Sequence, residues 1–167
     1  MVHRKRKIRS KRLAASLGLF VGFVALMIVI VFGLTQLLES NIQPIVLSDQ
    51  VCFDDDCFFV ELAITEEQKE VGLMFRGYLE PDTGMLFIFD EPDYYSFWMK
   101  NTLIHLDIIW MNEDREIVYI EREAEPCRES CRVLSPSEKA VYVLEIAGGL
   151  ADKLGIEEGM KADFFIS

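Results

Sequence analysis

The hydrophobic positions along this chain follow two patterns, one near the N-terminus and one in the remainder. Residues 13–34 form an unbroken apolar run in which Ser16 is the only polar side chain. As a helix rising about 1.5 Å per residue, such a run reaches roughly 33 Å, which is enough to cross a hydrocarbon core of about 30 Å. The pattern therefore predicts one N-terminal transmembrane helix, which we place at residues 13–38.

The residues flanking this run predict its orientation. Residues 1–12 carry seven Lys or Arg side chains and no acidic one, and basic residues mark the cytoplasmic side of a spanning helix. We expect a single-pass protein of the cell membrane with a cytoplasmic tail (1–12), a segment in the lipid bilayer (13–38), a tether (39–44) and an outward-facing domain (45–167). The alternative is a cleaved signal peptide, whose apolar region is usually about 7–15 residues long and ends in small residues. The run here is longer and lacks that ending.

From residue 45 onward, short apolar segments alternate with polar turns. Residues 45–64 predict two strands joined at residues 54–56, and the capping-box residues Thr65 and Gln68 predict a short helix at 66–75. Further strands are expected at 85–89, 97–99, 106–111, 116–121, 140–146 and 161–167, with a second helix at 148–154. Short strands at this spacing, with only two short helices, predict a mainly β (α+β) domain that is compact, barrel-like and partly closed.

An acidic surplus limits the partners of the predicted outer domain. The chain has 17 Lys and Arg against 28 Asp and Glu, so removing the seven basic residues of the tail leaves 10 basic residues and a formal charge of −18. Such a charge opposes binding of nucleic acids and other anionic polymers, so we expect no nucleic-acid partner. The acidity is consistent with a high-salt habitat, with a cationic or metal partner, or with ordinary solvation.

The common catalytic and cofactor motifs are absent. The two histidines are His3, in the tail, and His105, so a site with several histidine ligands is impossible in the outer domain. The sequence also lacks a G-x-S-x-G segment and a glycine loop that would cradle phosphate. We therefore expect neither a metal nor a cofactor.

Four cysteines lie in two short segments of the outer domain. Cys52 and Cys57 flank the first predicted hairpin turn, and Cys127 and Cys131 share one loop. Four cysteines permit three pairings. We expect the local disulfides Cys52–Cys57 and Cys127–Cys131, because an oxidising location favours disulfides. The alternative is a zinc site made by the four thiolates.

Several polar side chains interrupt the apolar segments of the domain. They are Arg76, Lys100, Asn101, Asp107 and Glu145. A buried charge is costly unless it is paired, so these residues either form an internal network of ion pairs and hydrogen bonds or line a cleft. An Asp–Lys or Arg–Glu pair at a barrel mouth suits a zwitterionic or hydroxyl-rich ligand. A carboxylate there can also act as an acid or base if its pKa is shifted.

Five segments of the chain resemble the domain of unknown function 192 family. They are GLMFR (72–76), GMLFIF (84–89), FWMKNT (97–102), LDII (106–109) and YVLEIAGG (142–149). The resemblance extends over roughly residues 45–167 and implies the same partly closed barrel, without a settled activity. The candidate site residues that fall on positions matching the family's motifs are Arg76, Trp98, Lys100, Asn101, Asp107 and Glu145. His105 departs from the family pattern, which more often has proline there.

These observations predict a membrane-anchored, extracytoplasmic module of the cell envelope rather than an enzyme. We expect it to bind a small ligand or an envelope protein through the six residues on matching positions. One alternative is an envelope hydrolase in which Asp107 or Glu145 is the acid or base and Lys100 or Arg76 stabilises an anion. A second alternative is a purely structural domain in which the same polar residues fix the loops.

Overall fold

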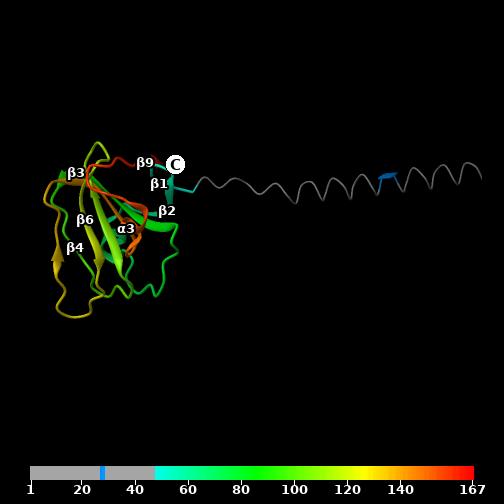
Figure 1. Ribbon diagram of the computed structural model, residues 1–167. Coiled ribbons are helices and arrows are strands. Elements are labelled where there is room, and N and C mark those ends of the chain that lie inside the picture. Colours follow the sequence, from blue (N-terminus) through cyan, green and yellow to red (C-terminus); the bar gives the residue numbers. More distant parts are fainter. Residues whose placement is uncertain (1–26, 29–47) are drawn as a thin grey trace, which may run out of the picture. The chain divides into compact units, whose positions relative to one another are not determined.

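The structure, a computed structural model, describes residues 27–28 and 48–167 (Figure 1). The predicted tail, tether and almost all of the predicted membrane anchor lie outside the described residues, and so does the orientation inferred from them. Within the described residues, no helix is both long enough and apolar enough to cross a membrane. The anchor and the outward position of the domain therefore stay predictions.

Residues 48–167 are built on one mixed seven-stranded sheet in the order β6-β5-β8-β3-β2-β1-β9, and β4 and β7 form a separate two-stranded sheet. The β2–β3 pair is parallel, and the other pairs within these two sheets are antiparallel. The strands are β1 (Gln50–Phe53), β2 (Asp56–Ala63), β3 (Thr83–Asp93), β4 (Phe97–Trp98), β5 (Leu106–Met111), β6 (Ile117–Ala124), β7 (Val133–Leu134), β8 (Ala140–Ala147) and β9 (Asp163–Phe165). The helices of this domain are α2 (Glu66–Val71) and α3 (Leu150–Leu154).

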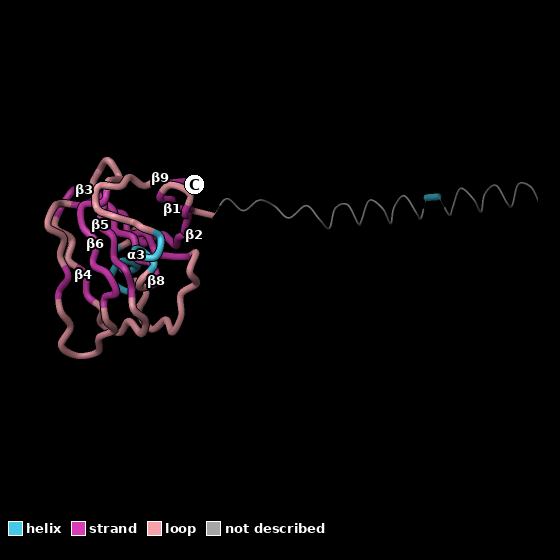
Figure 2. Tube along the Cα trace, viewed as in Figure 1, coloured by secondary structure: helices cyan, strands magenta, loops and turns pink. Residues whose placement is uncertain are grey.

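The seven-stranded sheet curls into a half-barrel whose outer edges meet at one end. The Ile117 N–H at the start of β6 donates to Met160 O at 2.8 Å, and the Ala162 N–H just before β9 donates to Arg115 O at 3.0 Å. A single bridge between Glu116 and Lys161 lies beside these bonds. Strands dominate the domain, and its helices are confined to two short segments (Figure 2). The predicted mainly β class and partial closure are confirmed.

Both faces of the sheet carry an apolar core. On one face, Ile109 and Leu144 pack with Ala151 of α3, and on the other, Ile108 packs with Trp110. The two isoleucines are neighbours on β5 and point to opposite faces, as strand geometry requires. All six residues of β5 are buried. A strand that is buried on both sides has a nearly continuous apolar sequence, here interrupted only by Asp107, and this explains why the strand was predicted with its correct bounds.

The helix α2 begins as predicted and ends earlier. The Gln68 N–H donates to Thr65 Oγ1, while Thr65 N–H donates to Gln68 Oε1, so the capping box is confirmed. The prediction of a helix to residue 75 was wrong, because Gly72 adopts a φ of +49° and ends the helix there. Phe75 is also in the left-handed region, with a φ of +64°. The chain between α2 and β3 is therefore a turn that carries Arg76.

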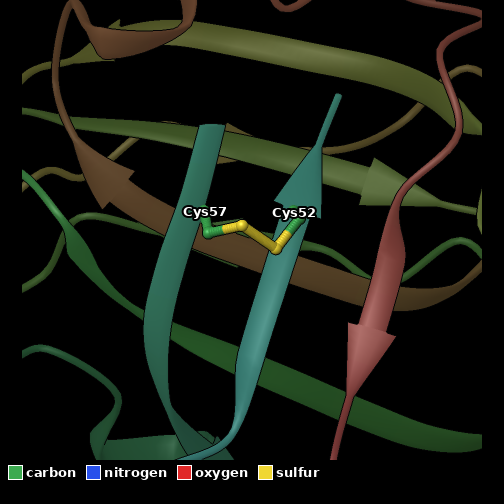
Figure 3. The surroundings of a disulfide bond; sticks show 2 residues. All are labelled: Cys52 and Cys57. Carbon is green, nitrogen blue, oxygen red and sulfur yellow. A yellow bond between two sulfur atoms is a disulfide. The ribbon is translucent and has the colours of Figure 1, made fainter. Parts of the chain in front are cut away.

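Both predicted disulfides are present. Cys52 and Cys57 are directly opposite each other on β1 and β2, with Cα atoms 4.0 Å apart (Figure 3). Cys127 and Cys131 close a loop of the chain with Cα atoms 5.5 Å apart. All four sulfurs are consumed in these bonds, and the described residues contain no free cysteine. The alternative of a four-thiolate zinc site is therefore wrong.

Candidate functional site

An arginine–glutamate pair marks one side of a cavity in this domain. Arg76 donates to both carboxylate oxygens of Glu61, at 2.5 and 2.7 Å. This bidentate pair fixes the plane of the guanidinium group, because its two parallel N–H groups match the spacing of the two carboxylate oxygens. The hydrogen bond from Arg76 lowers the pKa of the Glu61 carboxyl, and the reverse contact raises the pKa of Arg76. Both groups are therefore charged at neutral pH.

The cavity has a volume of about 330 Å³ and lies between β2, α2 and the turn that follows α2. Its walls combine charged and apolar side chains. The lining residues are Glu61, Leu62, Glu67, Gln68, Val71, Gly72, Arg76 and Met85. A cavity of this size and mixed character is at the small end of the range for small-molecule sites. We call it the Arg76 pocket.

Glu145 lies next to Met85 and Gly72, two of the residues that line the Arg76 pocket. It is opposite Met85 on the neighbouring strand, and Met85 is in turn opposite Glu61, so the three side chains project from the same face of the sheet. Glu145 is only 5% exposed, and its Oε2 has no hydrogen-bond partner among the described residues. Burial raises the pKa of Glu145 to about 8, although the charge of Arg76 acts to lower it. At neutral pH the carboxyl is therefore mainly protonated, and it is available as a hydrogen-bond donor.

Gly72 covers this carboxyl and also lines the pocket. A Cβ atom at this position would lie 3.8 Å from Glu145 Oε2 and 3.3 Å from Cζ of Phe87. The φ of +49° with a ψ of −134° is a conformation that residues with a side chain rarely adopt. Glycine is thus required both by the backbone and by the close approach of the phenylalanine ring.

Three further predicted residues, Trp98, Lys100 and Asn101, lie together beside the Arg76 turn. The Lys100 ammonium is 5.0 Å from the centre of the Trp98 ring, which is a cation–π distance. The Phe75 N–H donates to Asn101 O at 2.9 Å. Because Phe75 precedes Arg76, this bond ties the turn to the segment that holds the three residues. None of the three lines the Arg76 pocket.

Asp107 belongs to a different part of the domain. It is fully buried, and its carboxylate accepts hydrogen bonds from the N–H groups of Glu123, Gly149 and Ala151 at 2.7–3.0 Å. Its neighbour Ile108 is the residue opposite Glu145, so Asp107 projects from the other face of the sheet. The structure therefore brings Arg76 and Glu145 together and does not bring Asp107 to them.

A second cavity, of about 500 Å³, lies over β6 and the Cys127–Cys131 loop. Its acidic groups are partly engaged: Glu121 pairs with Arg132 and accepts a hydrogen bond from the Tyr119 hydroxyl at 2.9 Å. The lining residues are Met99, Glu121, Glu123, Ala124, Glu125, Pro126, Cys127, Ser130, Arg132 and Leu134. No predicted ligand-binding residue lines this cavity.

Comparison with known proteins places the chain in a family. The family model DUF192, described as Uncharacterized ACR, matches residues 50–164. The chain belongs to this family. No curated protein matches it.

Crystal structures of two other proteins share the DUF192 fold of this chain. A protein of unknown function from Novosphingobium aromaticivorans DSM 12444 is 37% identical, with a TM-score of 0.63, and the match covers 74% of this chain and 91% of that one. A protein from Sinorhizobium meliloti 1021, described as a proposed transcription regulator, is 34% identical, with a TM-score of 0.64, and covers 70% and 91%. In both cases the match covers nearly the whole of the crystallised chain.

Of the residues that line the Arg76 pocket, the sequence analysis selected only Arg76. Two of the residues that it missed, Glu61 and Gly72, contact the predicted residues Arg76 and Glu145. Glu61 lies between Val60 and Leu62, just as Glu145 lies between two apolar residues, so the same criterion would have selected it. Gly72 falls inside the helix predicted at 66–75, so it was not selected as a site residue. Its contact with Glu145 depends on the tertiary fold, and the sequence alone gives no signal for it.

Proposed function

We propose that this DUF192 domain is a binding module that holds a small polar ligand in the Arg76 pocket. The observation that carries the proposal is the buried Glu145 Oε2, which lacks a partner beneath a residue that lines the pocket. A buried polar atom left unpaired costs about 1–3 kcal/mol, so a fold keeps few of them. A ligand that bonds to Glu145 removes this cost and gains binding free energy from it.

The Arg76–Glu61 pair supplies a fixed polar contact for such a ligand. Two of the five N–H donors of the guanidinium are bonded to Glu61, and a guanidinium retains three others for a ligand. Fixing the group before binding reduces the entropy lost on binding. Leu62, Val71 and Met85 add apolar contact area on the same cavity.

We propose further that the module works outside the cytoplasm, anchored to the membrane through residues 13–38. The two disulfides support this position, because disulfides persist in oxidising compartments and are rare in the cytosol. The run of apolar residues preceded by a basic tail supports the anchor.

The alternatives are less well supported by the geometry. In the hydrolase alternative, Asp107 as the acid or base would lie on the face of the sheet opposite to Glu145 and be bonded to three backbone N–H groups. Glu145 as the acid or base lies near Arg76, but its Oε2 is buried beneath Gly72. A purely structural role suits Asp107, whose oxygens are satisfied by backbone N–H groups, but leaves the unpaired Glu145 oxygen unexplained. The description of one relative as a transcription regulator suggests contact with DNA, which the acidic surplus of this chain opposes.

Thermal unfolding of the full-length protein with a panel of small amines, carboxylates, sugars and peptides tests the proposal. Both tryptophans, Trp98 and Trp110, lie in the DUF192 domain, so their fluorescence reports on its unfolding. A ligand at about 100 times its Kd adds about 2.7 kcal/mol of stability. We expect this stabilisation to be lost in Arg76→Gln and kept in Arg132→Gln, which removes a matched arginine from the other cavity. A panel without any stabilising compound contradicts the proposal.

A further inference from the structure

The charges around the Arg76 pocket favour a cationic ligand. Two carboxylates line the pocket, Glu61 and Glu67, and the one cation of the lining, Arg76, is already bonded to Glu61 at two points. An anionic ligand could use only the N–H donors of Arg76 that Glu61 leaves free, and it would be repelled by the carboxylates of Glu61 and Glu67. A cationic ligand can pair with Glu67, whose carboxylate has no ion pair or hydrogen bond with the residues that the structure describes, without breaking the Arg76–Glu61 pair.

The surroundings of Glu145 lead to the same conclusion. The strands on either side present apolar residues to it: Met85 from β3 and Ile108 from β5. Gly72 covers Oε2 from the turn, and Arg76, held by Glu61, is the cation close enough to affect the carboxyl. Glu145 therefore lacks a direct cationic partner among the described residues, while its oxygen lies against the wall of the pocket.

The apolar part of the pocket points to an organic cation rather than a metal ion. Leu62, Val71 and Met85 line the cavity beside the carboxylates, and they offer contact area to an alkyl chain and no ligand that a hard cation prefers. Within residues 27–28 and 48–167, no group of three metal-binding side chains comes together.

We propose, as a consequence of the proposed function, that the ligand is an alkylammonium ion that pairs with Glu67 and Glu145 while its chain packs on Leu62, Val71 and Met85. Binding displaces the Gly72 turn, whose N–H is held by one hydrogen bond to Gln68 O at 2.9 Å. The O–H bond of the Glu145 carboxyl breaks, its proton passes to the solvent, and the resulting carboxylate pairs with the ammonium group. One proton is thus released for each ligand bound.

Calorimetry with three compounds of equal chain length tests this inference on the full-length protein in a nonionic detergent. They are 1,5-diaminopentane, glutarate and 1,5-pentanediol, which carry positive, negative and no charge. Titrations at pH 7 in two buffers of different ionisation enthalpy count the protons released. We expect 1,5-diaminopentane alone to bind, with release close to one proton. In Glu145→Gln we expect no proton release and at least about tenfold weaker binding, which corresponds to about 1.4 kcal/mol.

The controls separate this pocket from general attraction to an acidic protein. Glu125→Gln removes one exposed carboxylate from the second cavity and is expected to bind 1,5-diaminopentane as the wild type does. Equal binding in Glu145→Gln, or binding without proton release, overturns the inference. Binding of glutarate in place of 1,5-diaminopentane also overturns it but leaves the proposed function intact. If none of the three binds, the cationic ligand is wrong, and the broader thermal panel decides the proposed function separately.

Discussion

Replacing Glu145 by glutamine should remove a pH-dependent loss of stability. Glu145 is buried in an apolar part of the sheet with one oxygen unpaired, and burial raises its pKa from 4.5 to about 8. The folded protein therefore binds a proton between these pH values that the unfolded chain does not bind. Stability from this group is fully present below pH 4.5 and is lost as the pH rises through about 8.

The size of the effect follows from the two pKa values. A tenfold change in proton concentration is worth about 1.4 kcal/mol for one group, so the loss is about 3 kcal/mol at pH 7 and approaches about 5 kcal/mol above pH 8. Glutamine has nearly the same shape and stays neutral at every pH. We therefore expect the stability of Glu145→Gln relative to wild type to increase by about 2–3 kcal/mol between pH 5 and pH 7.

Urea unfolding of the full-length protein followed by tryptophan fluorescence measures this difference at each pH. Glu125→Gln, which removes an exposed carboxylate elsewhere, controls for the loss of one negative charge from an acidic domain. Parallel pH profiles for Glu145→Gln and wild type would refute the reasoning, because they would mean that Glu145 titrates alike in the folded and unfolded states.

Three other substitutions test separate parts of the structure. Gly72→Ala should cost about 1–3 kcal/mol in urea unfolding, because it forces a side chain into a positive φ against a buried ring, whereas Gly77→Ala, with open space around it, should stay within about 0.5 kcal/mol. Asp107→Ala should cost about 3 kcal/mol or more by the same assay, because it leaves three backbone donors without their acceptor; an unchanged unfolding midpoint would contradict this. Replacing Cys127 and Cys131 together by serine should cost about 2 kcal/mol, the loop-closure value for a separation of four residues; a loss near zero would show that the loop is already ordered without the disulfide.

Much of the fold could be predicted where local pattern and burial agree. The strand β5 is apolar except for Asp107 because both of its faces are covered, and its bounds were predicted without error. The Cys52–Cys57 disulfide followed from two cysteines that flank a hairpin turn. The strand β7, Val133–Leu134, was missed because two residues give no periodicity.

Other features depend on contacts between distant segments. The end of α2 was placed too late because the chain turns at Gly72, and the turn is held by a hydrogen bond from the Phe75 N–H to Asn101 O, which is far away in the sequence. The parallel pairing of β2 with β3 also has no local signal. Both determine where Arg76 lies, so the shape of the pocket could not be predicted from the sequence.

The candidate site was predicted only in part, because it too depends on contacts between distant segments. Arg76 and Glu145 were selected because charges between apolar residues need partners, and the structure brings these two together. Asp107 was selected by the same criterion, yet the register of β5 with β8 turns it to the other face. A charge in an apolar strand therefore indicates a buried polar contact, and strand register decides which residues share it.

Mapping the binding site by backbone amide chemical shifts tests the central claim most directly. The ¹⁵N-labelled full-length protein would be titrated with the compound of the panel that stabilises it most. We predict that the largest shifts fall on residues 68–76 and on Glu145, around the Arg76 pocket. Largest shifts on residues 121–134, around the second cavity, or shifts spread evenly over the acidic surface, would contradict the account.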